Sequence, residues 1–576
     1  MKFMKRSHIY KMVLGLAIAA LTQTSCSDEW DDHYNGTSTD PAAGVIGATL
    51  WDAIQKDPNL SNFASVVQAC GYDKSLGGSQ VFTVFAPTNS CFSAEEAQKL
   101  IQAYNEEKGK VDDDENTTIK EFIQNHIALY NYSVSPSSKD TIVMMNGKYA
   151  LMGADNISGS KYLTANQHFS NGILFTVGDK IGFFSNLFEY MRKDSDLDSI
   201  RSFFYNPMFY RSEFSPSESV AGGIEDGKTV YLDSVFRLQN DLFSILDARL
   251  NAEDSTYLMV APTNRVWKEL LEEYEAYFNY DNTVNDRDSL VYTMPRLAIT
   301  SGTTFSRTFN SDVSLRDSAI STLAPTSGLV RERLWGNDSL HYYEYFHPLS
   351  PNGVLTGTTD VTCSNGTMMK SDDWKFDKTN TFFQTVIIEA ERAGVIREVS
   401  TYTNAKDEKE ETILPRTRYV LSDNAFYKQV SNNAFVEFEP RRSTSNHTVV
   451  FNITNVLSNI GYDIYLVTAP ALANDSNATA IQRLPTNLRC TLGFHDQSGA
   501  EQKEELVSSV TTQPDICDHI LLAENFKFPV CTYGLYENMP QVTLTVETRV
   551  SSSQLRNNSH TRTMRIDCII LKPHQE

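Results

Sequence analysis

The chain contains residues that could do chemistry, but they do not form a known catalytic pattern. Its 576 residues include 11 histidines and 72 acidic residues, yet no G-x-S-x-G, HExxH, P-loop or strand-linked G-x-G-x-x-G motif. The run HYYEYFH (341–347) has a histidine at each end, but this spacing suits neither one helix face nor a tight metal site. We therefore expect no catalytic residue, no metal and no cofactor; an enzyme of unfamiliar design is the alternative.

Two other stretches could bind a ligand. The acidic run DDDE (112–115) could attract calcium, but it lacks the spacing and the distal glutamate of a calcium loop, which favours a solvated loop. The stretch SFFYNPMFYRSEF (202–214) could stack on sugars or anchor a partner protein if its rings were exposed. The alternative is that these rings fill a core or an interface. The candidate binding aromatics are Phe203, Phe204, Tyr205, Phe209 and Tyr210.

Charge and cysteine content narrow the class of protein. The formal net charge is −22, and there is no run of lysine and arginine. An acidic surface repels phosphates, so we expect no nucleic-acid partner. Besides Cys26 the chain has seven cysteines, an odd count that argues against a complete disulfide framework, although a bridge among the last four stays open.

The first 25 residues have the composition of a signal peptide. Basic residues precede the apolar stretch MVLGLAIAAL (12–21), which is too short to span a bilayer, and TQTSC (22–26) follows it. TQTSC resembles a lipobox, in which Cys26 becomes the first residue and carries acyl chains. The next residues, SDEWDDH (27–33), resemble the signal that directs lipoproteins of Bacteroidota to the outer face of the outer membrane. An ordinary cleaved signal peptide with a chance cysteine is the alternative.

These resemblances imply a lipid-anchored protein of the outer membrane that faces the cell exterior. Residues 1–25 would be removed, and residues 26–44 would form a lipidated, flexible leader. Several acyl chains, at about 0.8 kcal/mol per buried CH₂, would make the anchoring permanent without a transmembrane helix.

Three pairs of similar stretches occur in the same order along the chain. TLWDAIQKDPNLSNF (49–63) aligns with NLFEYMRKDSDLDSI (186–200) at an offset of 137 residues. VFAPTN (84–89) aligns with MVAPTN (259–264) at 175, and SNGILF (170–175) with SNGTMM (364–369) at 194. Because the offset grows, the pattern predicts a duplicated domain whose second copy carries insertions of 175 − 137 = 38 and 194 − 175 = 19 residues.

Each repeated stretch predicts a local structure. The first has the apolar spacing of a helix, and the second is a buried strand that Pro87 ends before a turn at Thr88 or Asn89. Ser93 and Glu96 then form a capping box at the start of a helix. The Asn-Gly pair of the third stretch predicts a turn that introduces a strand.

Both copies resemble fasciclin domains, which are compact α+β modules. TVFAPTNSCF (83–92) and HFSNGILFTVGDKI (168–181) resemble the two family motifs, and His126 matches the histidine between them. The resemblance implies one domain at 45–182 and a divergent second domain at 183–400, in which Arg296 replaces the histidine. The motif residues are either fold determinants or part of an edge that contacts a ligand or an integrin. They are Ala86, Pro87, Thr88, Asn89, His126, Asn171, Gly172, Ala261, Pro262, Thr263, Asn264, Asn365 and Gly366.

The last third of the chain has the alternating pattern of β-strands. FVEFEP (435–440), TVVFNI (448–453), YDIYLVTAP (462–470), VTLTVETRV (542–550) and TMRIDCIILK (563–572) are predicted strands. Short strands separated by turns favour an all-β sandwich or jelly roll at 416–576. The polar run TNAKDEKEET (403–412) is interpreted as a linker or surface loop.

The resemblance to fasciclin-domain surface lipoproteins of Bacteroidota implies a non-enzymatic binding protein. We expect an accessory subunit of a SusC/SusD-type outer-membrane uptake system that helps to capture a glycan or a peptide. The alternative is a cell-surface adhesin that binds host matrix, mucin or neighbouring cells. The sequence identifies neither the ligand nor the binding face.

Overall fold

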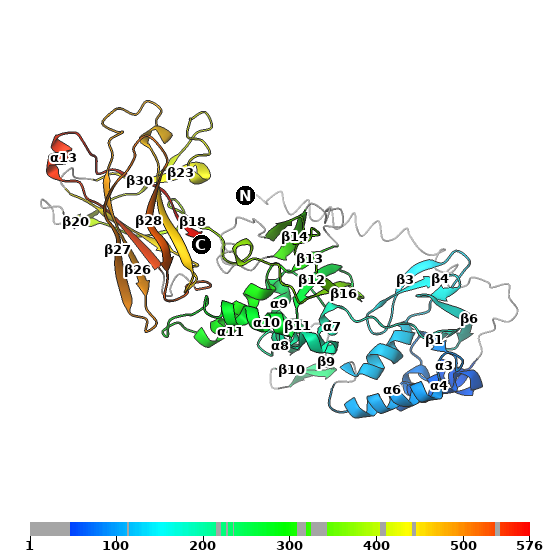
Figure 1. Ribbon diagram of the computed structural model, residues 1–576. Coiled ribbons are helices and arrows are strands. Elements are labelled where there is room, and N and C mark those ends of the chain that lie inside the picture. Colours follow the sequence, from blue (N-terminus) through cyan, green and yellow to red (C-terminus); the bar gives the residue numbers. More distant parts are fainter. Residues whose placement is uncertain are drawn as a thin grey trace, which may run out of the picture. The chain divides into compact units, whose positions relative to one another are not determined.

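The computed structural model describes residues 47–111, 115–214, 220–225, 228–233, 236–307, 318–323, 342–403, 410–440, 445–535 and 542–575. It forms two compact units, Met1–Phe183 and Phe184–Glu576, which are described separately (Figure 1). The predicted signal peptide, Cys26, most of the DDDE run and His341 lie outside the described residues. Among the residues that are described, no helix has both the length and the apolar character needed to cross a membrane.

Unit 1 is an α+β domain in which helices cover part of a curved sheet (Figure 1). Its elements are α3 (Leu50–Lys56), η1 (Pro58–Leu60), α4 (Ser61–Ala69), α5 (Asp73–Leu76), β1 (Phe82–Pro87), α6 (Ala94–Glu107), η3 (Ile119–Ile123), η4 (Gln124–His126), β2 (Ile127–Leu129), β3 (Lys139–Val143), β4 (Tyr149–Gly153), β5 (Asn156–Ile157), β6 (Ser160–Phe169) and β7 (Gly172–Val177).

The sheet of unit 1 has seven strands in the order β2-β1-β7-β6-β5-β4-β3. The central strands β1 and β7 run parallel and are buried along their whole length. An antiparallel bridge between Ala128 and Met144 links β2 to the chain just after β3, so the two edges of the sheet meet. The sheet therefore curls toward a closed barrel.

Unit 1 has two hydrophobic cores, one on each side of this sheet. Alternate side chains of β1, beginning with Phe82 and Val84, pack with the helices in one core. Phe85 points to the other side and packs with Ile173 and Phe175 of β7 inside the curved sheet. This division follows from the alternation of side chains along a strand.

The first part of unit 2 repeats the framework of unit 1 with additional strands. Its elements are α7 (Leu187–Lys193), η5 (Ser195–Leu197), α8 (Asp198–Phe204), β8 (Tyr210–Phe214), β9 (Val220–Glu225), β10 (Lys228–Asp233), β11 (Phe236–Asn240), α9 (Asp241–Ile245), β12 (Tyr257–Pro262), α10 (Asn264–Tyr274), α11 (Arg287–Thr300), β13 (Thr304–Ser306), β14 (Ser318–Leu323), β15 (Tyr342–Phe346), β16 (Thr358–Cys363), β17 (Gly366–Ser371) and η7 (Lys378–Asn380).

The strand order β13-β12-β17-β16 of unit 2 matches β2-β1-β7-β6 of unit 1, with the same strand directions. Even the register is repeated: Phe82 lies opposite Gly172 in one copy, and Tyr257 lies opposite Gly366 in the other. The two sheets therefore confirm the duplicated α+β fold that the sequence predicted.

Helix α8 corresponds to α4 at the same 137-residue offset as the first repeat, so the larger insertion begins after α8. The paired strands β8 and β11, the hairpin of β9 with β10, and helix α9 lie in this inserted region. The first residues of the aromatic stretch 202–214 therefore belong to the framework that both copies share.

The last part of unit 2 is a β-sandwich of two sheets (Figure 1). Its elements are β18 (Val386–Glu389), β19 (Ile396–Val399), β20 (Thr401–Thr403), β21 (Glu410–Thr412), β22 (Arg416–Tyr419), η8 (Ser431–Asn433), β23 (Ala434–Phe438), β24 (Thr448–Ile453), β25 (Gly461–Thr468), η9 (Ala471–Ala473), β26 (Asn487–His495), β27 (Glu501–Thr511), β28 (Asp518–Lys527), β29 (Val542–Thr548), α13 (Ser552–Arg556) and β30 (Met564–Pro573).

One sheet has the order β22-β23-β30-β25-β28, with β18 also paired to β30, and the other has the order β19-β24-β29-β26-β27. The five predicted strands appear as β23, β24, β25, β29 and β30. The predicted boundary needs correction, because β18 and β19 lie before residue 400 and pair with sandwich strands. Both are only four residues long, too short to show an alternating pattern in the sequence.

Within unit 2 the fasciclin-like part packs firmly against the sandwich. Tyr280 follows α10, is fully buried, and donates its hydroxyl to the carbonyl of Tyr533 at 2.6 Å. The amide of Asn279 donates to the Ser458 hydroxyl at 3.1 Å. One hydrophobic core runs from the α7 residues to strand β30. These two parts therefore form one compact body.

Candidate functional site

The asparagine of the first Asn-Gly pair is a buried structural clamp. The Asn171 side-chain oxygen accepts the amide of Leu50, the first residue of α3, at 2.8 Å. Its NH₂ group donates to the carbonyls of Leu76 and Gly78 at 2.8 and 2.9 Å. One side chain thus satisfies three main-chain groups that burial would otherwise leave unpaired.

Asn365 makes the same three hydrogen bonds in the second copy. Its oxygen accepts the amide of Leu187, the first residue of α7, at 2.9 Å. Its NH₂ group donates to the carbonyls of Leu250 and Ala252 at 2.8 and 2.9 Å. With only 2% of Asn365 and 3% of Asn171 exposed, neither side chain is accessible to a ligand.

The glycine of each pair lies where no side chain fits. Gly172 has φ +150°, and a Cβ there would lie 2.0 Å from the carbonyl oxygen of Phe82. Gly366 has φ +145°, and its Cβ would lie 1.9 Å from the carbonyl oxygen of Tyr257. Glycine is required because the parallel strand passes too close for any other residue.

The two Ala-Pro-Thr-Asn stretches also bind the main chain of their own domain. Asn89 accepts the amide of Asn62 at 3.1 Å and donates to the carbonyl of Pro58 at 2.9 Å. Asn264 accepts the amide of Ser199 at 2.8 Å and donates to the carbonyl of Ser195 at 2.7 Å. Each asparagine therefore fixes the start of α4 or α8 against the end of the neighbouring strand.

The other residues of these stretches complete the ends of β1 and β12. Ala86 and Ala261 are fully buried, and Pro87 and Pro262 are the last strand residues. The amides of Thr88 and Thr263 donate to the carbonyls of Val177 and Ser371 at 3.2 and 3.1 Å. The Thr263 hydroxyl also donates a hydrogen bond to the Asp372 carboxylate at 2.6 Å.

His126 is held as a neutral ring in the core of unit 1. Its Nε2 accepts the amide of Ile181 at 3.0 Å, so Nδ1 carries the proton and donates to the carbonyl of Phe122 at 2.7 Å. Burial lowers the pKa of His126 to about 4, and the charge of nearby Lys180 acts in the same direction. A ring with both nitrogens bound to main chain is not placed to transfer protons to a substrate.

The strand register corrects the prediction that Arg296 replaces this histidine in the second copy. Leu129 lies opposite Phe82 and Ser306 lies opposite Tyr257, so Thr303, directly before β13, corresponds to His126, directly before β2. Arg296 lies within α11, and its guanidinium donates to the carbonyl of Tyr292 at 2.7 Å and lies 4.0 Å from Glu275.

The structure corrects the hypothesis that the aromatic stretch at 202–214 exposes rings for binding. Phe203 and Phe204 lie on α8 and occupy the positions of Val66 and Val67 on α4. Both are buried, and so is Phe209. They are core residues because the helix face that carries them packs on the sheet, as it does in the first copy.

The two tyrosines of this stretch are partly buried against the same core. The Tyr205 ring stacks on Phe188 with centroids 4.1 Å apart, and its hydroxyl donates to the Phe188 carbonyl at 2.9 Å. The Tyr210 ring lies 5.1 Å from that of Tyr205. This packing favours the alternative that the aromatic stretch covers the domain core.

Two tyrosines of the aromatic run at 341–347 also pack inward. Tyr343 and Tyr345 of β15 are buried with Phe305 inside the second sheet, whereas His347 is exposed. Alternation along β15 thus places these two tyrosines in the core and leaves Phe346 exposed.

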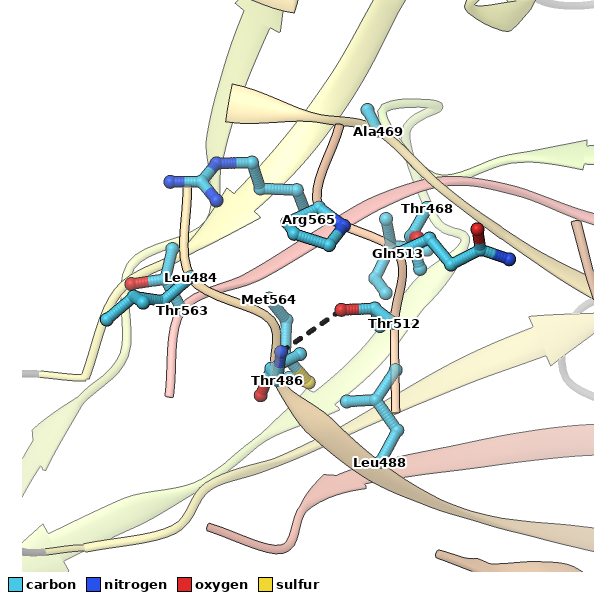
Figure 2. Close-up of a pocket in the computed structure, with 12 residues that line it drawn as sticks. Thr468, Ala469, Leu484, Thr486, Leu488, Thr512, Gln513, Thr563, Met564 and Arg565 are labelled. Carbon is cyan, nitrogen blue, oxygen red and sulfur yellow. Dashed lines mark hydrogen bonds between the residues drawn. The ribbon is translucent and has the colours of Figure 1, made fainter. Parts of the chain in front are cut away.

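A small cavity lies in the sandwich (Figure 2). Threonine side chains line much of it, and the amide of Thr486 donates to the hydroxyl of Thr512 at 3.0 Å across it. Its volume of about 20 Å³ holds one water molecule, and a sugar ring does not fit.

An exposed apolar surface lies on strands β3 and β4 of unit 1. Val143 pairs with Tyr149, and Leu151 lies on the same side of β4; they are 47%, 51% and 66% exposed. The intervening Ile142 and Ala150 are buried, so the exposed residues share the outer face of the sheet. We call Val143, Tyr149 and Leu151 the β3–β4 face. Sequence reasoning missed it because its strands are short and its exposed residues are apolar.

The seven cysteines of the described residues are free thiols. Of the last four, Cys490, Cys531 and Cys568 are buried. Burial raises the pKa of the Cys490 and Cys531 thiols to about 12, which keeps them protonated and unreactive.

Comparison with known proteins agrees with this architecture. Residues 58–181 match the family model of the Fasciclin domain. No match was found among curated proteins. The fold class is therefore the predicted one: fasciclin-like α+β structure followed by a β-sandwich.

Three solved structures were matched to parts of the chain. A FAS1 domain pair from the insect cell adhesion molecule Fasciclin I is 11% identical over 56% of this chain and 98% of its own, with a TM-score of 0.18. The CBM22-1 xylan-binding domain of Paenibacillus barcinonensis Xyn10C is 12% identical over 32% of this chain and 99% of its own, with a TM-score of 0.18. The C-terminal family 22 carbohydrate binding module of Clostridium thermocellum Xyn10B is 12% identical over 33% of this chain and 91% of its own, with a TM-score of 0.17. At these TM-scores the likenesses support no inference about a ligand.

Proposed function

We propose that this protein is a non-enzymatic, lipid-anchored binding protein of the outer-membrane surface, and an accessory subunit of a SusC/SusD-type uptake system. The β3–β4 face is the observation that carries the binding role. Apolar side chains that are contiguous and exposed on a folded sheet gain free energy when a partner covers them. The partner we propose is the protein component of such an importer, which captures a glycan or a peptide.

The motif side chains hold the fold together, which supports a binding role for the protein over a catalytic role. Asn171, Asn365, Asn89 and Asn264 are committed to main-chain hydrogen bonds. His126 is neutral and has both ring nitrogens occupied. These side chains stabilise the fold, which leaves the surface strands to make the contacts with other molecules.

The proposal is tested by isolating the tagged, lipidated protein from detergent-solubilised outer membranes. We expect a TonB-dependent transporter and its lid lipoprotein to co-purify in stoichiometric amounts. The double variant Tyr149→Glu, Leu151→Glu should reduce their recovery at least about tenfold, because two charges would be buried at the contact. Ile481→Glu is the matched control, since Ile481 is also 66% exposed but lies in the sandwich.

A clean preparation without the transporter would contradict the importer assignment. The match of residues 58–181 to the Fasciclin domain then favours the second candidate, a surface adhesin. In that case the wild type and Ile481→Glu should bind immobilised matrix protein, mucin or neighbouring cells, and the Tyr149→Glu, Leu151→Glu variant should not. If the double variant behaves like the wild type in both assays, the β3–β4 face is not the binding surface.

A further inference from the structure

Two carboxylates and a thiol meet inside the sandwich at one end of strand β18, and a third carboxylate lies nearby. Glu389 is the last residue of β18, Glu391 follows two residues later, and Asp567 lies in β30. One oxygen each of Glu389 and Asp567 and the sulfur of Cys568 lie within 4.8 Å of one another. Two oxygen ligands on opposite sides of a cation, each about 2.4 Å away, are about 4.8 Å apart, so these atoms are close enough to share one ion.

Each carboxylate has one oxygen bound by a protein group and one oxygen left without a partner. Glu389 accepts the hydroxyl of Ser431 at 2.6 Å, and Asp567 accepts the amide of Ser431 at 3.1 Å. Glu391 accepts the side-chain NH₂ of Asn432 at 3.1 Å. Among the described residues, the second oxygen of each acid is buried and has no hydrogen-bond partner.

Asp567 is the most constrained of the three acids. The residue is 1% exposed, and its free Oδ1 has no hydrogen-bond partner within the described chain. Burial, reinforced by the charges of Glu389 and Glu391, raises its pKa to about 7. A buried, partnerless carboxylate oxygen costs free energy, so such an atom calls for a ligand.

The backbone is arranged to bring these groups together. Strand β30 has a bulge opposite Val467 and Thr468, and Asp567 is the residue left unpaired there. On the other edge of β30, β18 ends opposite Cys568, while β23 begins its pairing at Ile566. A bulge re-aims a side chain, and here it turns Asp567 toward the gap between β18 and β23.

We propose that Glu389 and Asp567, with Glu391 beside them, form a divalent-cation site for which calcium is the fitting ion. The oxygen donors are the Glu389 and Asp567 carboxylates and the Ser431 hydroxyl, and the nearby Glu391 adds negative charge. Calcium takes six to eight oxygen ligands with flexible geometry. Two or more water molecules would complete the coordination. A thiol is a ligand for softer ions, so Cys568 lies beside the site and is not part of the calcium shell.

The ion would fix the first strand of the sandwich. β18 pairs only with β30 among the described strands, over four residues, and it follows directly on the fasciclin-like part of unit 2. A cation shared by Glu389 on β18 and Asp567 on β30 would tie this short strand to the centre of its sheet. The proposed site is thus a clamp at the junction of the two parts of unit 2.

The full chain, purified in detergent and stripped with EDTA, provides the test. Calcium at about 100 times its Kd should raise the unfolding temperature of unit 2 by about 3 °C. It should also slow hydrogen exchange of the β18 amides by up to about 100-fold, because opening the strand would release the ion. No shift with calcium would overturn the proposal.

Three variants distinguish the site from other effects. Asp567→Asn should abolish the calcium shift without destabilising the calcium-free protein, since it removes a buried charge while keeping the shape. Glu389→Gln should act in the same way. The control is Glu437→Gln, because Glu437 is a buried acid on β23 that already pairs with Arg418 and Arg565 at 2.7 and 2.8 Å. It should lower stability and leave the calcium shift intact.

Cys568→Ala separates calcium from zinc. The calcium shift should survive this variant, and zinc at the same concentration should stabilise the wild type less than calcium does. Loss of the calcium shift in Cys568→Ala, or a larger shift with zinc that the variant abolishes, would overturn the assignment to an oxygen-ligated calcium ion.

Discussion

The two fasciclin-like copies share an internal framework and differ in the groups attached to it. In both, a parallel strand pair has the same register, and an Asn-Gly pair joins the second strand to the start of a helix. The side chains that make these hydrogen bonds are identical, although most of the surrounding core residues are not. The motif is retained where one side chain satisfies several buried main-chain groups at once.

Outside this framework the copies have diverged in ways that change their surfaces. The first copy has a buried neutral histidine, His126, and the exposed β3–β4 face. The second copy has Thr303 in place of the histidine, additional strands after α8, and a hydrogen-bonded junction with the sandwich. One fold thus leaves an apolar face exposed in one copy and packs against another domain in the other.

The largest expected effect comes from the two glycines of the framework. Gly172→Ala and Gly366→Ala should each lower the free energy of unfolding of their own copy by about 4 kcal/mol, because the new methyl group meets the neighbouring strand and the backbone is strained. Urea unfolding of the full chain, followed by hydrogen exchange in each unit, measures both.

Gly109→Ala is the control for backbone strain alone. Gly109 has φ +73°, and nothing lies within 4 Å of the added Cβ. It should cost about 1 kcal/mol. A similar cost for Gly109→Ala and Gly172→Ala would show that close strand packing is not what requires glycine.

A smaller effect is expected from the asparagines of the same pairs. Asn171→Ala and Asn365→Ala should each cost about 3 kcal/mol, since three main-chain groups lose their partner and stay buried. The same unfolding experiment measures the loss. Asn105→Ala, at an exposed position of α6, should change stability by less than about 0.5 kcal/mol. If Asn365→Ala were silent while Asn171→Ala was not, the second copy would not depend on this clamp.

The smallest expected effect is a loss of stability at low pH in the first copy, caused by His126. The pKa of His126 is lowered from 6.5 to about 4 on folding, so the unfolded chain binds the proton first as the pH falls. The stability contributed by the neutral ring is complete above pH 6.5 and is lost below it, by about 2 kcal/mol at pH 5.

His126→Gln should remove this loss, because glutamine can donate and accept but does not titrate in this range. Hydrogen exchange of α3 and β1 at pH 7 and pH 5 measures it within unit 1. Unit 2 has its own acid-sensitive group, His447, whose pKa burial lowers to about 4, so the readout must be specific to unit 1. An unchanged pH dependence in the variant would assign the effect to other groups.

The sequence alone determined the duplicated framework, because its signals are local. Pro87 ends a strand, Ser93 and Glu96 cap a helix, and Asn171-Gly172 introduces a strand through interactions close in the sequence, so two copies of the pattern predict two copies of the fold. The alternating strands of the sandwich were predictable for the same reason. The lipid anchor, the importer and the adhesion role stay predictions.

Only the tertiary structure decided which side chains are buried and which distant residues meet. The rings at Phe203 and Phe204 could have faced solvent, and packing of α8 on the sheet placed them in the core. Strand β18 was recognisable only through its pairing with β30 near the end of the chain. Glu389 and Asp567 meet because that pairing and a bulge bring them together, and no local pattern encodes a contact between residues so far apart in the sequence.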